Sequence, residues 1–220
     1  MSHPTIAFVA LLVAGSIGAV KPNKTLINVE VYYESLCPDS IYFITRELAP
    51  AYPHLKDFLH LKLVPFGKAS WIIDENNRTK FTCQHGPNEC WGNRAQACAL
   101  MEIEHLSVAD PQLRQHKALD VVNCVMSSGD PALAVPQCAE KQGLPAEAIE
   151  RIGKCSGSTY GDELLIANGK KTKAFETPLK FVPSIVINGE KSAAAFKNFR
   201  SIVCRLIAVS EKPAACGPSS

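Results

Sequence analysis

The sequence predicts an α/β fold in a single domain, and three observations lead to this prediction. Residues 26–33 and 58–66 alternate apolar and polar side chains, as half-buried strands do, with a helical pattern between them. Residues 91–154 have helical patterns broken by proline and glycine. Strand character returns at residues 181–187. We therefore predict a helical block, at about residues 83–160, inserted between a β–α–β half and a β-hairpin–helix half.

The first half begins with a strand whose alternate side chains form one apolar face: Ile27, Val29, Val31 and Tyr33. A helix is expected directly after Cys37, because apolar residues follow at helical spacing at Ile41, Ile44 and Leu48. We expect Pro50 and Pro53 to end this helix. The strand at residues 58–66 comes next. A strand, a helix and a strand within roughly forty residues imply parallel strands and a right-handed crossover.

The inserted block contains three expected helices, at residues 94–106, 117–126 and 146–152. Proline and glycine residues separate them, as is typical of helix boundaries. Six cysteines lie in or beside this block: Cys83, Cys90, Cys98, Cys124, Cys138 and Cys155. The Lys-rich stretch that follows is predicted to be a solvated loop rather than a binding site, and its residues are Lys170, Lys171 and Lys173.

The last half contains a strand at residues 181–187, a hairpin turn and a final helix at residues 194–209. Asn188 and Gly189 are a strong signal for the turn. Pro183 is unusual inside a strand, because proline removes a ladder hydrogen bond. Two interpretations remain open for it, namely an edge-strand proline and an X-Pro bond in the cis form.

The N-terminus has the pattern of a secretory signal peptide, predicted at residues 1–19 and followed by one domain at residues 20–220. Its apolar run is shorter than the roughly 20 residues that a membrane span requires. Nine cysteines fit the oxidising environment of a secreted or lumenal protein. Asn23 and Asn77 begin sequons and are candidate glycosylation sites. A net charge of +2 gives no indication of nucleic acid as a partner.

Cys37 lies where a redox nucleophile would be placed. A thiol attacks a disulfide as thiolate, and the free N–H groups and the dipole of a helix N-terminus stabilise a negative sulfur. Pro38 suits the first helical turn. The negative charge of Asp39 opposes the thiolate, whereas the hydroxyl of Ser40 could donate a hydrogen bond to the sulfur. Cys37 is therefore the candidate nucleophile.

The order of the predicted elements is that of a thioredoxin-type fold. In such a fold a cis-proline loop lies beside the nucleophilic cysteine, and the backbone of this loop can pair with the substrate chain. The order strand, cysteine, helix and strand, followed by strand with proline, strand and helix, agrees with this arrangement. Pro183 and Val182 are accordingly candidate substrate-binding residues.

The segment CQHGPNECWGNRAQAC, residues 83–98, is called the signature segment below. It resembles the signature of the gamma-interferon-inducible lysosomal thiol reductase family, which is Cys-Gln-His-Gly, two residues, Glu-Cys, two residues, Asn, four residues and Cys. The resemblance extends over most of the mature chain. The matching positions of the signature are Cys83, Gln84, His85, Gly86, Glu89, Cys90, Asn93 and Cys98.

The resemblance implies a thioredoxin-like fold with a disulfide-rich helical insertion. It also implies a soluble glycoprotein of the endolysosomal or secretory route that reduces disulfides in other proteins at acidic pH. The active-site motif of vertebrate members is Cys-x-x-Cys, and its first position corresponds to Cys37. Its second position is Ser40 here, and the Cys-x-x-Ser form is also common among invertebrate members. We expect no cofactor.

The eight cysteines other than Cys37 are expected to form structural disulfides, and they comprise Cys204, Cys216 and the six of the inserted block. Eight cysteines allow 105 pairings, which stay open, although Cys204 with Cys216 would tie the tail to the last helix. A zinc site is the metal alternative, but its spacings lack the usual short C-x₂₋₄-C element, so we expect no metal. Its ligands would be Cys83, Cys90, Cys98 and His85.

His85 has two further interpretations. It could serve as a base for Cys37, or it could be a structural residue of a disulfide-rich turn. Nothing in the sequence places His85 near Cys37, and we favour the structural role.

A serine in the second motif position changes the expected chemistry, because a hydroxyl cannot displace a substrate from a mixed disulfide. We therefore favour a thiol–disulfide oxidoreductase in which Cys37 attacks a protein disulfide and an external small thiol, or the substrate's own second cysteine, resolves the adduct. The alternative is a secreted binding protein that keeps the fold without turnover. An inert disulfide-rich secreted protein is a third interpretation, which leaves the positions of Cys37 and Pro183 unexplained.

Overall fold

The computed structural model describes residues 24–217. The predicted signal peptide and the sequon at Asn23 lie outside the described residues. Within residues 24–217, no helix is both long and apolar enough to span a membrane.

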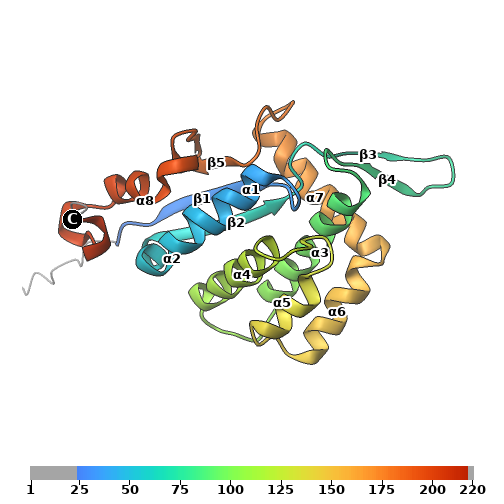
Figure 1. Ribbon diagram of the computed structural model, residues 1–220, viewed down its shortest axis with the longest axis horizontal. Coiled ribbons are helices and arrows are strands. Elements are labelled where there is room, and N and C mark those ends of the chain that lie inside the picture. The colour runs from blue at the N-terminus through green and yellow to red at the C-terminus, as the bar shows by residue number, and fades with distance from the viewer. Residues whose placement is uncertain (1–23, 218–220) are drawn as a thin grey trace, which may run out of the picture.

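A four-stranded sheet with the order β2-β1-β5-β6 forms the centre of the molecule (Figure 1). Strands β1 (Ile27–Tyr33) and β2 (Leu59–Pro65) pair in parallel over seven residues. Strand β5 (Ser184–Ile187) pairs antiparallel with β1 on its other side and continues through a hairpin into β6 (Glu190–Lys191). The predicted β–α–β unit and the hairpin are confirmed.

Pro183 directly precedes strand β5 and is not inside it, which corrects the prediction of a strand at residues 181–187. Because its nitrogen lies outside the ladder, the missing N–H removes no sheet hydrogen bond. The turn after β5 has the expected geometry, since Asn188 and Gly189 both have positive φ, at 50° and 86°. A two-residue hairpin turn with positive φ at both positions matches the twist of the strands.

The helix that follows Cys37 continues further than predicted. It consists of α1 (Pro38–Tyr42), a π-helical turn (Phe43–Leu48) and α2 (Ala49–Leu55). A 3-10 turn (Lys56–Phe58) then leads into β2. The prediction that Pro50 and Pro53 end the helix is wrong. The wider π turn directly precedes α2, Pro50 lies in the first turn of α2, where a proline removes no helical hydrogen bond, and Pro53 lies inside α2.

The main hydrophobic core lies between one face of the sheet and the helices that cover it. Alternate side chains of β1 point into this core, as the sequence pattern predicts. Helix α8 (Ala195–Leu206) packs here beside α2, and Phe199 meets Phe43 edge to face with ring centroids 5.8 Å apart. The largest fully buried side chains of this core are Tyr33, Tyr52, Phe43, Phe199, Ile27, Ile44, Leu48, Leu55, Leu59 and Leu119.

Helices α3 to α7 form the inserted block, which gathers beside the sheet in Figure 1. The three predicted helices are present with longer bounds, and two more accompany them. The bounds are Pro87–Glu104 for α3, Pro111–Met126 for α4, Val135–Lys141 for α5, Ala146–Ser156 for α6 and Thr159–Phe175 for α7. A second apolar core fills the space between α3, α4, α5 and α6.

Helix α7 was not predicted, and its position corrects the interpretation of the Lys-rich stretch as a loop. Lys170, Lys171 and Lys173 lie in the last turns of this helix. Gly161 and Gly169 weaken the helical signal in the sequence, because glycine is a poor helix former. Gly169 is needed for packing, since a Cβ atom there would lie 2.7 Å from the ring of Phe66 and 2.6 Å from that of Trp71.

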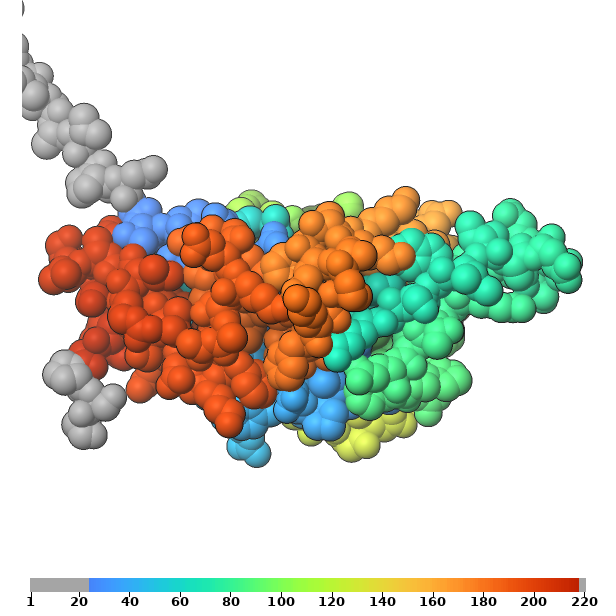
Figure 2. Space-filling model, turned by 90° about the horizontal axis from the view of Figure 1, so that it is seen from above, coloured from blue at the N-terminus to red at the C-terminus, as the bar shows by residue number. Residues whose placement is uncertain are grey.

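A separate hairpin, β3 (Ser70–Ile73) and β4 (Thr79–Thr82), projects from one end of the molecule (Figure 2). The sequence does not predict this hairpin, because most of its side chains are exposed and show no clean apolar alternation. Asn77 lies in its turn with a φ of 58° and is exposed. This sequon is therefore on the surface.

Four disulfides pair eight of the cysteines: Cys83–Cys90, Cys98–Cys155, Cys124–Cys138 and Cys204–Cys216. The last of these ties the C-terminal tail to helix α8, as the sequence suggested. The zinc alternative from the sequence is excluded, since Cys83, Cys90 and Cys98 are all in disulfides. Cys37 is the free cysteine of residues 24–217.

Candidate active site

Cys37 is the N-cap residue of helix α1, directly after the loop that leaves strand β1. Its backbone is extended, with φ −69° and ψ 122°, and Pro38 follows in the first helical turn. A proline there is favourable because its missing N–H belongs to a position without a helical partner. The remaining free N–H groups of this first turn place positive partial charge near the sulfur.

The sulfur of Cys37 lies against the backbone before Pro183. Its Sγ donates a hydrogen bond to the carbonyl oxygen of Val182 at 3.8 Å, and the Val182–Pro183 peptide bond is cis. Cys37 packs with Val182 and Leu179, and only 6% of its surface is exposed. The structure thus brings together three residues of the predicted site, Cys37, Val182 and Pro183, although 145 positions separate Cys37 from Val182.

Ser40 is fully buried in the first turns of helix α1. Its Oγ accepts a hydrogen bond from the backbone N–H of Glu34 at 3.3 Å. This bond ties the loop between β1 and α1 to the helix. A bond from Ser40 to the sulfur of Cys37, which the sequence suggested, is not among the hydrogen bonds of residues 24–217.

Helix α3 also holds this loop in place. The Oδ1 of Asn93 accepts a hydrogen bond from the backbone N–H of Ser35 at 2.8 Å, and the Oγ of Ser35 donates to the carbonyl oxygen of Glu89 at 3.1 Å. The hydroxyl of Tyr33 donates to the Oε1 of Gln96 at 2.7 Å. Glu89, Asn93 and Gln96 are fully buried and lie on one face of the helix, because they are spaced by four and three residues.

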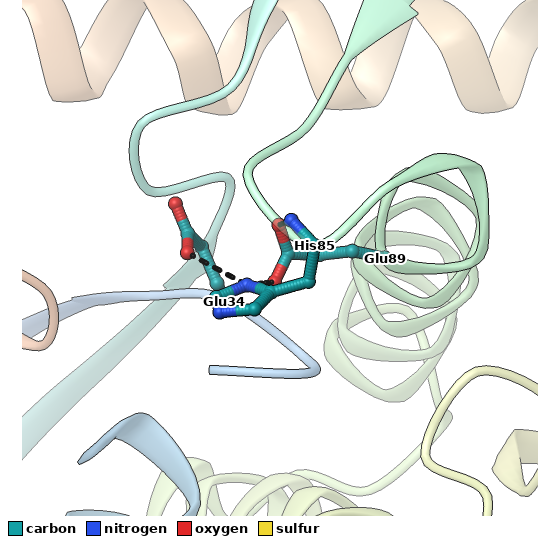
Figure 3. Close-up of side chains that lie close together, drawn as sticks. All are labelled: Glu34, His85 and Glu89. Atoms are coloured by element: carbon teal, nitrogen blue, oxygen red, sulfur yellow. Dashed lines mark hydrogen bonds and ion pairs between the residues drawn. The ribbon is translucent and has the colours of Figure 1, made fainter. Parts of the chain in front are cut away.

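Glu34, His85 and Glu89 form a compact ionisable cluster at the base of this loop (Figure 3). The Nδ1 of His85 lies 2.5 Å from the Oε2 of Glu89 and 3.6 Å from the Oε2 of Glu34. Both carboxylates are buried, and 33% of the His85 side chain is exposed. Burial raises the pKa of Glu34 to about 7, and the charge of Glu89 adds to this effect, whereas the backbone hydrogen bond from Lys68 opposes it.

Comparison with known proteins identifies the family of the chain. A family profile described as "Gamma interferon inducible lysosomal thiol reductase (GILT)" matches residues 28–142, more than half of the sequence. "Gamma-interferon-inducible lysosomal thiol reductase-like protein" of Anopheles gambiae is 35% identical, over 95% of this chain and 88% of that protein. "GILT-like protein 1" of Drosophila melanogaster is 38% identical, over 86% and 75% of the two chains.

The chain belongs to the gamma interferon inducible lysosomal thiol reductase family. It is accordingly a thiol–disulfide oxidoreductase. "Gamma-interferon-inducible lysosomal thiol reductase" of Carassius auratus is 35% identical, over 90% of this chain and 75% of that protein.

Solved structures show the fold of this family member. DsbA of Chlamydia trachomatis has a TM-score of 0.53 at 17% identity, covering 83% of this chain and 87% of that one. MdbA of Actinomyces oris, described as a thiol-disulfide oxidoreductase, has a TM-score of 0.55 at 13% identity, covering 86% and 83%. The predicted thioredoxin-like fold with a helical insertion is confirmed.

The signature segment of the family supports the loop that leads to Cys37. It forms the loop after β4 and the first half of helix α3, and its polar members His85, Glu89 and Asn93 all face the loop that leads to Cys37. The Cys83–Cys90 disulfide closes the turn that carries His85. The hydrogen-bonding partner of His85 is Glu89, and the structure describes no contact between His85 and Cys37.

Glu34 and Ser35 are members of this site that sequence reasoning missed. The signal was present in the sequence, because a glutamate directly after a buried strand is unusual without a partner. Gly67 reveals how closely Glu34 is packed, since its φ is +60° and a Cβ atom there would lie 2.2 Å from the Cγ of Glu34.

Replacing Asn93 with alanine is expected to destabilise the chain by about 1–3 kcal/mol, because the buried N–H of Ser35 loses its acceptor. Urea unfolding monitored by circular dichroism measures this loss. Asn88→Ala is the matched control, since Asn88 is exposed in the first turn of the same helix. Equal stability of the two variants would contradict the role assigned to Asn93.

Proposed function

We propose that this family member reduces or isomerises protein disulfides through Cys37 alone, with an external thiol releasing the mixed disulfide. The observation that carries this proposal is the state of the nine cysteines. Eight of them are paired with each other, and Cys37 is free at a helix N-terminus with Ser40 in the second motif position.

The reaction begins when the thiolate of Cys37 attacks one sulfur of a substrate disulfide. A Cys37–substrate disulfide forms, and the second substrate sulfur leaves as a thiolate. An external thiolate then attacks the mixed disulfide and frees the substrate. A second external thiol regenerates Cys37, so two thiols are oxidised to one disulfide for each substrate disulfide reduced. In isomerisation the substrate's own thiolate attacks instead, and no net oxidation occurs.

The surroundings of Cys37 support both states of the sulfur that this sequence requires. The carbonyl oxygen of Val182 accepts a hydrogen bond from the thiol form. The thiolate form gains from the free N–H groups at the start of helix α1. The same Val182 backbone precedes the cis bond to Pro183, and we propose these two residues as the contact for an extended substrate segment.

We also propose that the chain works in the lysosome or outside the cell. Relatives in Carassius auratus and Mus musculus are named lysosomal thiol reductases. Four disulfides fit an oxidising compartment, and the exposed Asn77 in the β3–β4 turn is accessible for glycosylation. Small thiols and disulfide-containing proteins are the partners that this function requires.

The low exposure of Cys37 favours one alternative function, which is a binding protein without turnover. With only 6% of its surface accessible, the sulfur could be shielded in a binding protein that has no turnover. The test mixes the purified protein with insulin and a small thiol near pH 5 and near pH 7. We expect insulin reduction whose rate rises with the thiol concentration, and an intact-mass adduct of one substrate chain per molecule. Absence of the adduct and of thiol-dependent reduction would overturn the proposal.

A further inference from the structure

We propose that Glu34, His85 and Glu89 form a binding site for one divalent cation of the zinc type. Each of the three residues offers one donor atom, and these three atoms lie within 4.8 Å of one another. The Nδ1 of His85 lies 3.6 Å from the Oε2 of Glu34 and 2.5 Å from the Oε2 of Glu89. They come from three separate segments, namely the loop after β1, the loop after β4 and the first turn of helix α3 (Figure 3). This proposal goes beyond the thiol chemistry of Cys37.

Both carboxylates are oriented by the backbone, which leaves one oxygen of each directed at the centre of the cluster. The Oε1 of Glu34 accepts a hydrogen bond from the N–H of Lys68 at 2.6 Å. The Oε1 of Glu89 accepts one from the N–H of His85 at 3.0 Å. Hydrogen bonds to the outer atoms of metal ligands orient those ligands in protein metal sites. Here the orientation is built into the fold.

The Oε2 of Glu34 is a buried polar atom without a partner in residues 24–217, and it supports a cation site independently of the arrangement of the three residues. This atom is buried without any hydrogen-bond partner among the described residues, and the side chain of Glu34 has no exposed surface. Its neighbour in the cluster is the Nδ1 of His85, at 3.6 Å, which is too long for a hydrogen bond. Buried polar atoms in native proteins almost always have a partner. A cation at the centre of the cluster would supply one.

The charges of the ionised cluster also suit a divalent cation. The two glutamates carry two negative charges when ionised, and a protonated His85 returns one. Within residues 24–217, no lysine or arginine side chain forms an ion pair with Glu34 or Glu89, and Lys68 contributes its backbone N–H. A divalent cation bound to two carboxylates and a neutral imidazole leaves the site without net charge.

The donor set selects the kind of cation. One imidazole nitrogen and two carboxylate oxygens suit Zn²⁺, whereas Ca²⁺ and Mg²⁺ prefer oxygen ligands alone. The His85 side chain is 33% exposed, so water can reach the cluster and complete a fourth position.

A cation here would tie the loop of Cys37 to helix α3. Glu34 is three residues before Cys37, and Ser35, which follows Glu34, is already bonded to Asn93 and Glu89. The cation would add a bond between this loop, the turn closed by the Cys83–Cys90 disulfide and the helix. We therefore expect bound zinc to raise the thermal unfolding temperature.

The test uses the full protein with the change Cys37→Ala, because a free thiol binds zinc by itself. After treatment with a chelator, the protein is titrated with ZnCl₂ at pH 7.5 by calorimetry, and native mass spectrometry counts the bound ions. We expect one Zn²⁺ per molecule, a higher unfolding temperature, and at least a tenfold weaker affinity in Glu34→Gln and in His85→Ala. Titration with MgCl₂ or CaCl₂ is expected to produce neither effect.

The matched controls are Glu104→Gln and His105→Ala, which change exposed residues at the end of the same helix and should leave binding unchanged. Zinc K-edge absorption of the zinc-loaded Cys37→Ala protein gives a test that needs no second variant, and we expect nitrogen and oxygen scatterers without sulfur. Absence of stoichiometric binding, a sulfur signal, or equal affinity in the cluster variants and their controls would each overturn the proposal.

Discussion

Replacing Cys37 with serine is expected to lower thiol-dependent insulin reduction to the uncatalysed rate and to eliminate the mixed-disulfide adduct. The physical reason is that a hydroxyl at neutral or acidic pH cannot attack a disulfide, whereas a thiolate can. The remaining cysteines cannot compensate, because all eight are joined in disulfides. Insulin turbidity and intact-mass spectrometry under identical thiol concentrations measure the two effects.

The fold of this variant should stay close to that of the parent chain. Serine fills almost the same space beside Leu179 and Val182, and its hydroxyl can donate the hydrogen bond that the carbonyl oxygen of Val182 accepts from Cys37. Circular dichroism and the mass of the oxidised chain serve as controls that the helices and the four disulfides are intact. Thiol-dependent reduction above the uncatalysed rate in a folded Cys37→Ser protein would show that another sulfur carries the reaction.

Much of the scaffold that holds Cys37 can be predicted from sequence alone, because local patterns determine it. Strand β1 alternates cleanly since one face is buried in the main core. The helix after Cys37 shows its apolar spacing for the same reason. Asn188 and Gly189 predict their turn because few residues adopt positive φ easily. In each case the local sequence and the tertiary packing favour the same structure.

Helix α7 and the β3–β4 hairpin could not be predicted in this way. The glycines of α7 lower its helical signal in the sequence. The need for glycine at position 169 is apparent only from the structure, where the rings of Phe66 and Trp71 pack against it. The hairpin has no strong turn signal, and most of its side chains are exposed, although Trp71 and Phe81 pack against the rest of the chain. Tertiary packing determines the secondary structure of both segments, and this packing cannot be inferred from local sequence patterns.

Some residues of the candidate site can also be predicted from local sequence, whereas others cannot. Cys37 and Pro183 are recognisable because each breaks a local pattern, at a helix start and next to a strand. The cluster of Glu34, His85 and Glu89 depends on how helix α3 docks on the loop after β1, more than fifty residues earlier in the chain. The signature segment therefore identifies the family, whereas its physical role appears only in three dimensions.

Replacing Ser40 with cysteine is expected to make the lifetime of the mixed disulfide independent of the external thiol. The new thiol lies on the first turns of helix α1, three residues after Cys37, where it can displace the substrate and form an internal disulfide with Cys37. A well-oriented intramolecular group can act at an effective concentration of about 10⁵ M or more, far above that of any small thiol. Quenching the reaction with acid and counting adducts over time measures the lifetime at several thiol concentrations.

The control Ser40→Ala separates the kinetic effect of the new thiol from the loss of stability that any substitution of Ser40 causes. Both variants weaken the hydrogen bond from the N–H of Glu34, so both should lose roughly 1 kcal/mol of stability. Only the cysteine variant should change the kinetics, because only it adds a nucleophile. A lifetime in Ser40→Cys that still shortens in proportion to the external thiol would mean that the buried position 40 cannot reach the mixed disulfide. The site would then depend on external thiols whichever residue is at position 40, because a cysteine there would not release the substrate from the mixed disulfide.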